Sequence, residues 1–84
     1  MKILFTKTSE KQLLKLSLRF QEKVFETIKK FEKGERVDFK KLKGSSEEYR
    51  IRVGGYRIIL SKKESNLFLV TDLGKRENIY SIFI

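Results

Sequence analysis

Cysteine and histidine are both absent from the sequence, and each absence removes a class of chemistry. Without cysteine the chain has neither a disulfide bond nor a thiolate metal site, so a hydrophobic core must hold the fold. Without histidine it lacks the usual proton carrier at neutral pH, the Ser-His and Cys-His nucleophile pairs, and the commonest metal ligand. We therefore expect no metal ion and no cofactor.

Proline, low-complexity linkers and internal repeats are also absent. A chain of 84 residues is enough for one small domain and too short for two, so we expect a single domain over residues 1–84. No apolar run approaches the roughly 20 residues that a membrane span needs, and the apolar part of the N-terminus is too short for a secretory signal. We expect no association with membranes.

Positive charge is what the sequence has in excess. The 20 lysines and arginines against 11 aspartates and glutamates give a net charge of +9 at pH 7. A charge of this size on a small domain suggests a polyanionic partner, which is a nucleic acid, an anionic membrane or an acidic protein. Solubility alone explains much of the lysine on the predicted helices, but it does not explain the arginines described below.

The first part of the chain predicts a strand and two helices. Residues 2–6 are typical of a strand, and Ser9 with Gln12 matches the capping box that starts a helix. A break near Ser17 precedes a longer helix, which ends before Gly34 because glycine is a good C-terminal cap. The apolar side chains expected to pack on a sheet are Leu13, Leu14 and Leu16 in the first helix, and Phe20, Val24, Phe25, Ile28 and Phe31 in the second.

The second part predicts mostly strands. Residues 35–48 are a polar connection, in which Phe39 and Leu42 are the expected anchors. The predicted strands are Glu48–Val53, Tyr56–Ser61 and Leu67–Asp72, followed by an extended tail, Asn78–Ile84. The order β-α-α-β-β-β(-β) predicts an α+β domain, with two N-terminal helices packed on one face of a twisted, mostly antiparallel sheet.

The stretch YRIRVGGYRIIL, residues 49–60, predicts a hairpin around its Gly-Gly pair. This register places Arg52 directly opposite Arg57, with Arg50 on the same face. Like charges placed opposite one another destabilise a hairpin by roughly 0.2–1 kcal/mol. The helices must cover the other face, which carries Tyr49, Ile51, Val53, Tyr56 and Ile58.

The three arginines are therefore expected on an open sheet face, with no acid in register at its middle. Lys75 and Arg76 follow the last predicted strand, and Tyr80 comes four residues after Arg76. A solvated polar surface is the simplest interpretation of such a face, but the cross-strand repulsion favours a functional surface. Several guanidinium groups beside a tyrosine suit a phosphodiester, through bidentate phosphate contacts and stacking on a base.

These residues resemble a known family. The segments KLKG, YRIRVGGYRIIL and LGKRENIY, in this order, are similar to the RelE/ParE superfamily of toxins from type II toxin–antitoxin systems, and the resemblance covers essentially the whole chain. The short RelE-like members are the most similar. This resemblance implies a RelE-like fold and a cytoplasmic toxin that works as an mRNA interferase. Such a toxin cleaves mRNA in the ribosomal A site, without metal, by attack of a 2′-hydroxyl on the adjacent phosphorus.

The resemblance also implies partners and site residues. The partners are the ribosome, mRNA and a small, acidic, partly disordered antitoxin, which forms a hetero-oligomeric complex with the toxin. By position, the catalytic residues are Arg50, Arg52, Arg57, Arg76 and Tyr80, and the residues that bind RNA or the ribosome are Lys43, Lys75, Arg50 and Arg52.

The chain departs from RelE itself at two positions. Arg50 and Arg52 stand where RelE carries lysines, and an arginine does not lose its proton in proteins. We therefore expect both arginines to orient phosphates and to offset charge in the transition state, which leaves Tyr80 as the base and the acid unassigned.

Two alternatives stay open: a ParE-like toxin that inhibits DNA gyrase without nuclease activity, and a catalytically inactive RNA-binding member. The complete basic set together with Tyr80 favours the nuclease.

Overall fold

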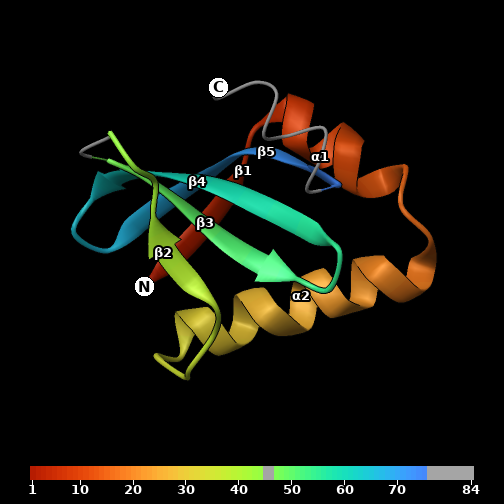
Figure 1. The fold of residues 1–84 in the computed structure, drawn as a ribbon, viewed down its shortest axis with the longest axis horizontal. Helices are drawn as coiled ribbons and strands as arrows, with labels where there is room; N and C mark the ends of the chain where they lie inside the picture. The colour runs from red at the N-terminus through yellow and green to blue at the C-terminus, as the bar shows by residue number, and fades with distance from the viewer. Residues whose placement is uncertain (45–46, 76–84) are drawn as a thin grey trace.

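The computed structural model describes residues 1–44 and 47–75 (Figure 1). Five strands form one sheet in the order β1-β5-β4-β3-β2, in which β1 pairs with β5 in parallel and the other neighbours are antiparallel. The predicted α+β class is confirmed. The elements are β1 (Lys2–Phe5), α1 (Lys7–Leu14), α2 (Leu18–Glu32), β2 (Phe39–Lys41), β3 (Glu48–Val53), β4 (Tyr56–Glu64) and β5 (Leu67–Lys75).

Helix α1 begins earlier than predicted. Its N-cap is Thr6, whose side-chain oxygen accepts a hydrogen bond from the backbone N–H of Ser9 at 3.0 Å. Ser9 is fully buried, and its hydroxyl donates to the carbonyl oxygen of Val70 on β5 at 2.7 Å. The prediction that Ser9 caps the helix is wrong, because this buried hydroxyl instead ties α1 to the sheet.

Gln12 also differs from its predicted capping role. Strand β1 ends at Phe5, and beyond this point α1 lies against the edge of β5 (Figure 1). There Oε1 of Gln12 accepts the backbone N–H of Leu73 at 2.8 Å, and Nε2 donates to Oδ1 of Asp72 at 2.7 Å. The Gln12 side chain therefore accepts a hydrogen bond from the Leu73 N–H, a backbone donor of β5 that lies beyond the end of β1.

Helix α2 has the predicted ends. Ser17 is its N-cap, and its hydroxyl accepts the backbone N–H of Phe20 at 3.4 Å. Lys33 is the C-cap, and Gly34 follows with a φ of 79°, a left-handed conformation that favours glycine. The break near Ser17 and the stop at Gly34 are both confirmed.

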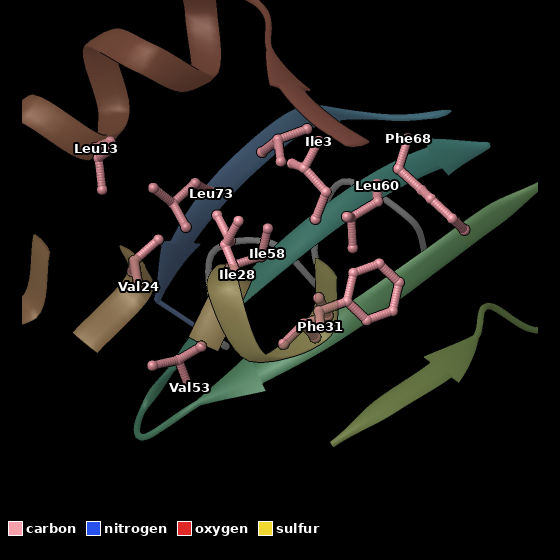
Figure 2. Packing of buried hydrophobic residues seen from close by; sticks show 12 residues of the cluster. Ile3, Leu13, Val24, Ile28, Phe31, Val53, Ile58, Leu60, Phe68 and Leu73 are labelled. Atoms are coloured by element: carbon pink, nitrogen blue, oxygen red, sulfur yellow. The ribbon is translucent and has the colours of Figure 1, made fainter. Parts of the chain in front are cut away.

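One stripe of α2 packs onto the sheet. Val24, Ile28 and Phe31 are buried and face the apolar side chains of β3, β4 and β5 (Figure 2). Phe25 is 48% exposed and Leu14 of α1 is 63% exposed, so the expectation that both join the core is wrong. Phe25 directly follows the buried Val24, and Leu14 directly follows the buried Leu13. Successive side chains on a helix point about 100° apart, so Phe25 and Leu14 point away from the sheet. The core is Ile3, Leu13, Val24, Ile28, Phe31, Ile51, Val53, Ile58, Leu60, Phe68, Val70 and Leu73.

The connection before β3 contains a strand that was not predicted. Phe39 of β2 pairs with Ile51 of β3, and its ring stacks on Tyr49 with centroids 4.9 Å apart. The ring also lies 4.7 Å from that of Phe31 on α2. Phe39 is thus an anchor, as expected, but it acts from within a strand. Three residues are too few to produce an alternating pattern in the sequence.

The remaining strands follow the predicted order. β3 has the predicted bounds, whereas β4 and β5 both extend past the predicted ends, to Glu64 and Lys75. The predicted tail, Asn78–Ile84, lies outside the described residues. Within the described ranges, no helix has the length and apolar character that crossing a membrane requires.

Candidate functional site

The arginine hairpin has the predicted register. Gly54 and Gly55 form the turn between β3 and β4, and Gly54 has a φ of 58°, which suits a two-residue turn. Arg52 lies directly opposite Arg57. Because side chains alternate along a strand, Arg50, Arg52 and Arg57 share the face opposite the one that α2 covers.

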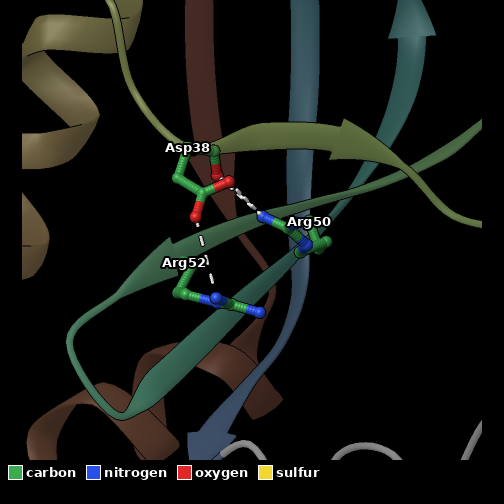
Figure 3. Close-up of polar contacts among 3 residues, drawn as sticks. All are labelled: Asp38, Arg50 and Arg52. Atoms are coloured by element: carbon green, nitrogen blue, oxygen red, sulfur yellow. Dashed lines mark hydrogen bonds and ion pairs between the residues drawn. The ribbon is translucent and has the colours of Figure 1, made fainter.

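This face carries an acid that the sequence analysis missed. Oδ1 of Asp38 accepts a hydrogen bond from Nη1 of Arg50 at 2.7 Å, and Oδ2 lies 3.9 Å from Nε of Arg52 (Figure 3). The carbonyl oxygen of Asp38 also accepts the backbone N–H of Arg52 at 3.0 Å. Asp38 directly precedes β2 and continues its pairing with β3. The expectation of no acid in register at the middle of the face is therefore wrong.

The face is also less open than expected. Arg50 is 7% exposed and Arg57 is 2% exposed, whereas the side chain of Arg52 is 38% exposed. The Arg50 guanidinium is turned toward Asp38 and donates hydrogen bonds to its carboxylate and carbonyl oxygens. Arg57 lies on the central strand β4, between Arg52 of β3 and Gly74 of β5. Of these three arginines, Arg52 is the one with a substantially exposed side chain.

The charge state of Asp38 follows from its neighbours. The hydrogen bond from Arg50 lowers the pKa of the Asp38 carboxyl, partial burial opposes this shift, and the positive charges of Arg50, Arg52 and Lys40 lower the pKa further. Asp38 is thus a carboxylate at neutral pH. A carboxylate with a lowered pKa is a weak proton acceptor, so Asp38 is better suited to holding arginines than to removing a proton.

The lysines predicted to bind RNA lie apart from the arginines. Lys43 is exposed beyond the Glu48 end of β3, whereas Arg52 lies at the hairpin end. Lys75 is exposed and pairs with Tyr56, which places it on the other face of the sheet. Arg76 and Tyr80 lie outside the described residues.

A basic residue that sequence reasoning missed belongs to this face instead. Lys40 of β2 is exposed and pairs with Arg50 of β3. Its position is determined by the pairing of β2 with β3, which the sequence did not predict.

A comparison with protein families identifies the chain. The model of the ParE toxin of type II toxin–antitoxin systems, parDE, matches residues 3–80. The chain belongs to the RelE/ParE toxin superfamily. A comparison with curated proteins found no match.

Solved structures of RelE proteins share the fold of this RelE/ParE toxin. A chain of the RelB–RelE antitoxin–toxin complex from Methanococcus jannaschii matches with a TM-score of 0.80 and 28% identity, over 96% of this chain and 99% of that chain. The isolated Escherichia coli RelE toxin matches with a TM-score of 0.73 and 24% identity, over 96% and 92%. The archaeal RelE–RelB complex from Pyrococcus horikoshii OT3 matches with a TM-score of 0.67 and 27% identity, over 89% and 93%.

Proposed function

We propose that this toxin is a ribosome-dependent, metal-independent endoribonuclease that cleaves mRNA in the A site and thereby inhibits translation in the cytoplasm. The observation that carries the proposal is the cross-strand pair of Arg52 and Arg57, with Arg50 on the same sheet face. Guanidinium groups on two neighbouring strands can donate hydrogen bonds to the two non-bridging oxygens of a phosphodiester. The likeness to RelE structures at 28% and 27% identity supports the same activity.

The proposed reaction is attack of a 2′-hydroxyl on the adjacent phosphorus. The new O–P bond forms as the bond to the 5′-oxygen breaks, and the departing 5′-oxygen takes a proton from water, which leaves a 2′,3′-cyclic phosphate and a 5′-hydroxyl. Arg52 and Arg57 offset the charge that grows on the phosphoryl oxygens in the transition state. Arg76 and Tyr80 belong to the proposed site on sequence grounds, with Tyr80 as the proton acceptor. The ribosome contributes by holding the mRNA in line for attack.

The test is cleavage of mRNA on translating ribosomes, with DNA supercoiling by gyrase assayed in parallel. We expect new 5′ ends within codons at the A site, and no inhibition of gyrase. Arg52→Ala should abolish cleavage, whereas Arg19→Ala, the same charge change on the exposed surface of α2, should not. Inhibited gyrase with intact mRNA contradicts the proposal, and binding of RNA without any cleavage indicates an inactive member.

A second candidate function is inhibition of DNA gyrase without cleavage. It is favoured by the match of the ParE family model over residues 3–80. The burial of Arg50 and Arg57 also favours it, because buried guanidinium groups are less accessible to RNA. The parallel gyrase assay separates the two candidates.

We also propose a cognate antitoxin, which is small, acidic and partly disordered, and which forms a hetero-oligomeric complex with the toxin. The net charge of +9 favours an acidic partner, and the M. jannaschii and P. horikoshii matches are antitoxin–toxin complexes. An acidic segment that folds on binding could cover the arginine face. Association should then slow steeply as salt rises, and the complex should have a higher Tm than the free toxin. Association that does not depend on salt contradicts the electrostatic part of this proposal.

A further inference from the structure

The two arginines of β3 are held in different ways. Nη1 of Arg50 donates to two oxygens of Asp38, the carboxylate Oδ1 at 2.7 Å and the carbonyl oxygen at 3.0 Å. The Arg50 side chain is only 9% exposed. In contrast, Nε of Arg52 is buried and makes no hydrogen bond to any described residue, and Oδ2 of Asp38 at 3.9 Å is too far to accept one. The Arg52 side chain is 38% exposed.

We propose that Asp38 is a positioning residue that fixes Arg50 as a buried support and leaves Arg52 as the arginine that contacts the RNA phosphate. This inference rests on the proposed nuclease function, and it divides between two arginines a role that the sequence assigns equally to both. Asp38 itself does not contact the reacting atoms.

The energetics of the two contacts support this division. A short, charge-assisted hydrogen bond to a buried guanidinium is strong, and breaking it to reach RNA would leave Arg50 buried without its carboxylate. Arg52 loses much less interaction energy on binding RNA, because its contact with Asp38 is an ion pair at 3.9 Å between two partly exposed side chains. A phosphate can therefore bind Arg52 without displacing Asp38 from Arg50.

The charge of Asp38 also restricts where a phosphate can lie. Asp38 continues β2 alongside Arg52, so its carboxylate repels anions from the β2 side of Arg52, whereas Lys40 adds a positive charge farther along β2, opposite Arg50. On the other side, Arg52 pairs with Arg57 of β4. The phosphate is thus directed toward the Arg52–Arg57 pair and away from Arg50.

The experiment measures how a single-stranded RNA oligonucleotide binds at several salt concentrations. The plot of log K against log salt has a negative slope, and each phosphate contact that is lost makes this slope shallower by about 0.7 for a single strand. We expect this reduction in Arg52→Gln, and we expect no change of slope in Arg50→Gln, which removes the same charge. Asp38→Asn should bind RNA more tightly, with a slope steeper by up to about 0.7, because the face loses a negative charge and the hydrogen bond that holds Arg50 loses its charge assistance. Arg19→Gln on α2 is the matched control for a lost surface charge.

Cleavage on ribosomes supplies the second measurement. Asp38→Asn should lower kcat without raising KM, because the RNA still binds but the phosphate is no longer held in one place. A purely structural role predicts a different pattern, in which RNA binding and kcat weaken together in proportion to the unfolded fraction. Asp38 and Arg52 are both substantially exposed, so these two variants carry the test even if a variant of the buried Arg50 fails to fold.

Three results would overturn the inference. The first is an equal loss of slope in the Arg50 and Arg52 variants, and the second is an Asp38→Asn protein with unchanged slope and unchanged kcat. The third is a wild-type protein that binds no RNA, since Arg52 is named as a phosphate contact. If the slopes are as expected but ribosomes show no cleavage, the proposed nuclease function fails while the assignment of Asp38, Arg50 and Arg52 stands.

Discussion

Arg52 on β3 lies directly opposite Arg57 on β4, but their exposures differ widely. The side chain of Arg52 is 38% exposed, whereas Arg57 is 2% exposed at the centre of the sheet. An RNA phosphate that approaches this pair therefore meets Arg52 at the surface and Arg57 beneath it. The two arginines should respond differently to substitution, since Arg57 belongs to the folded interior as well as to the proposed site.

Substitution of Arg57, like that of Arg52, should reduce cleavage strongly, whereas substitution of Arg19 should not. Loss of one charge-assisted donor to the transition state costs on the order of 10²–10³ in rate, so we expect this loss in Arg57→Gln. The measurement is the rate of mRNA cleavage on ribosomes, with circular dichroism to verify folding, because Arg57 is buried. Arg19→Gln is the control. A folded Arg57→Gln protein with the wild-type rate would show that Arg57 takes no part in the reaction.

Tyr80→Phe should separate proton transfer from stacking. The phenylalanine ring still stacks on a base but cannot accept a proton, so a base role predicts a rate reduced by roughly 10²-fold or more. The measurement is single-turnover cleavage on ribosomes, which isolates chemistry from product release. An unchanged rate excludes the phenol from the chemistry and leaves stacking as its role.

The Asp38–Arg50 contact should make stability depend on acidic pH. In the unfolded chain the Asp38 carboxyl titrates near its ordinary value of 3.8, and in the folded protein its pKa is lower. The stabilisation is therefore fully present above pH 3.8 and is lost as the pH falls through the folded pKa. We expect wild type to have a higher Tm than Asp38→Asn at neutral pH, and this difference to shrink below pH 3.8. A difference in Tm that stays constant on acidification contradicts the lowered pKa.

Gln12→Ala should destabilise the toxin without affecting its site. The variant loses one of two acceptors for the Leu73 N–H, the other being Oδ1 of Asp72 at 3.0 Å, and it also loses the donor to Asp72. These losses should lower the free energy of unfolding by about 1–2 kcal/mol. Denaturant unfolding measures this as a lower midpoint at an unchanged m-value. Lys11→Ala, at an exposed position of the same helix, is the control and should have the wild-type midpoint. Equal midpoints for the two variants would show that the Gln12 contacts contribute nothing.

The strands that carry the site could be predicted because their patterns are long. The Gly54-Gly55 turn and the six residues on each side of it determine the register that places Arg52 opposite Arg57. Helix α2 and its stop at Gly34 follow from equally strong periodicity and capping signals.

Asp38 could not be found in the same way. It acts through β2, a strand of three residues whose pairing depends on the aromatic contacts of Phe39 rather than on local sequence. The burial of Arg50 followed from that contact and was missed with it. At the start of α1, Thr6 and Ser9 are both N-cap residues by local rules, with serine the better one, and a distant partner, the carbonyl oxygen of Val70, engages Ser9 instead.

The pairing of β1 with β5 has a consequence for biosynthesis. Lys2 lies beside Leu67, so β1, which is synthesised before the other described strands, must wait for β5 before it can pair. Until then β4, the central strand, has one unpaired edge, and an open edge can pair with another chain. The sheet can thus be completed only after β5 has emerged, and the open edge exposes growing chains to aggregation until then.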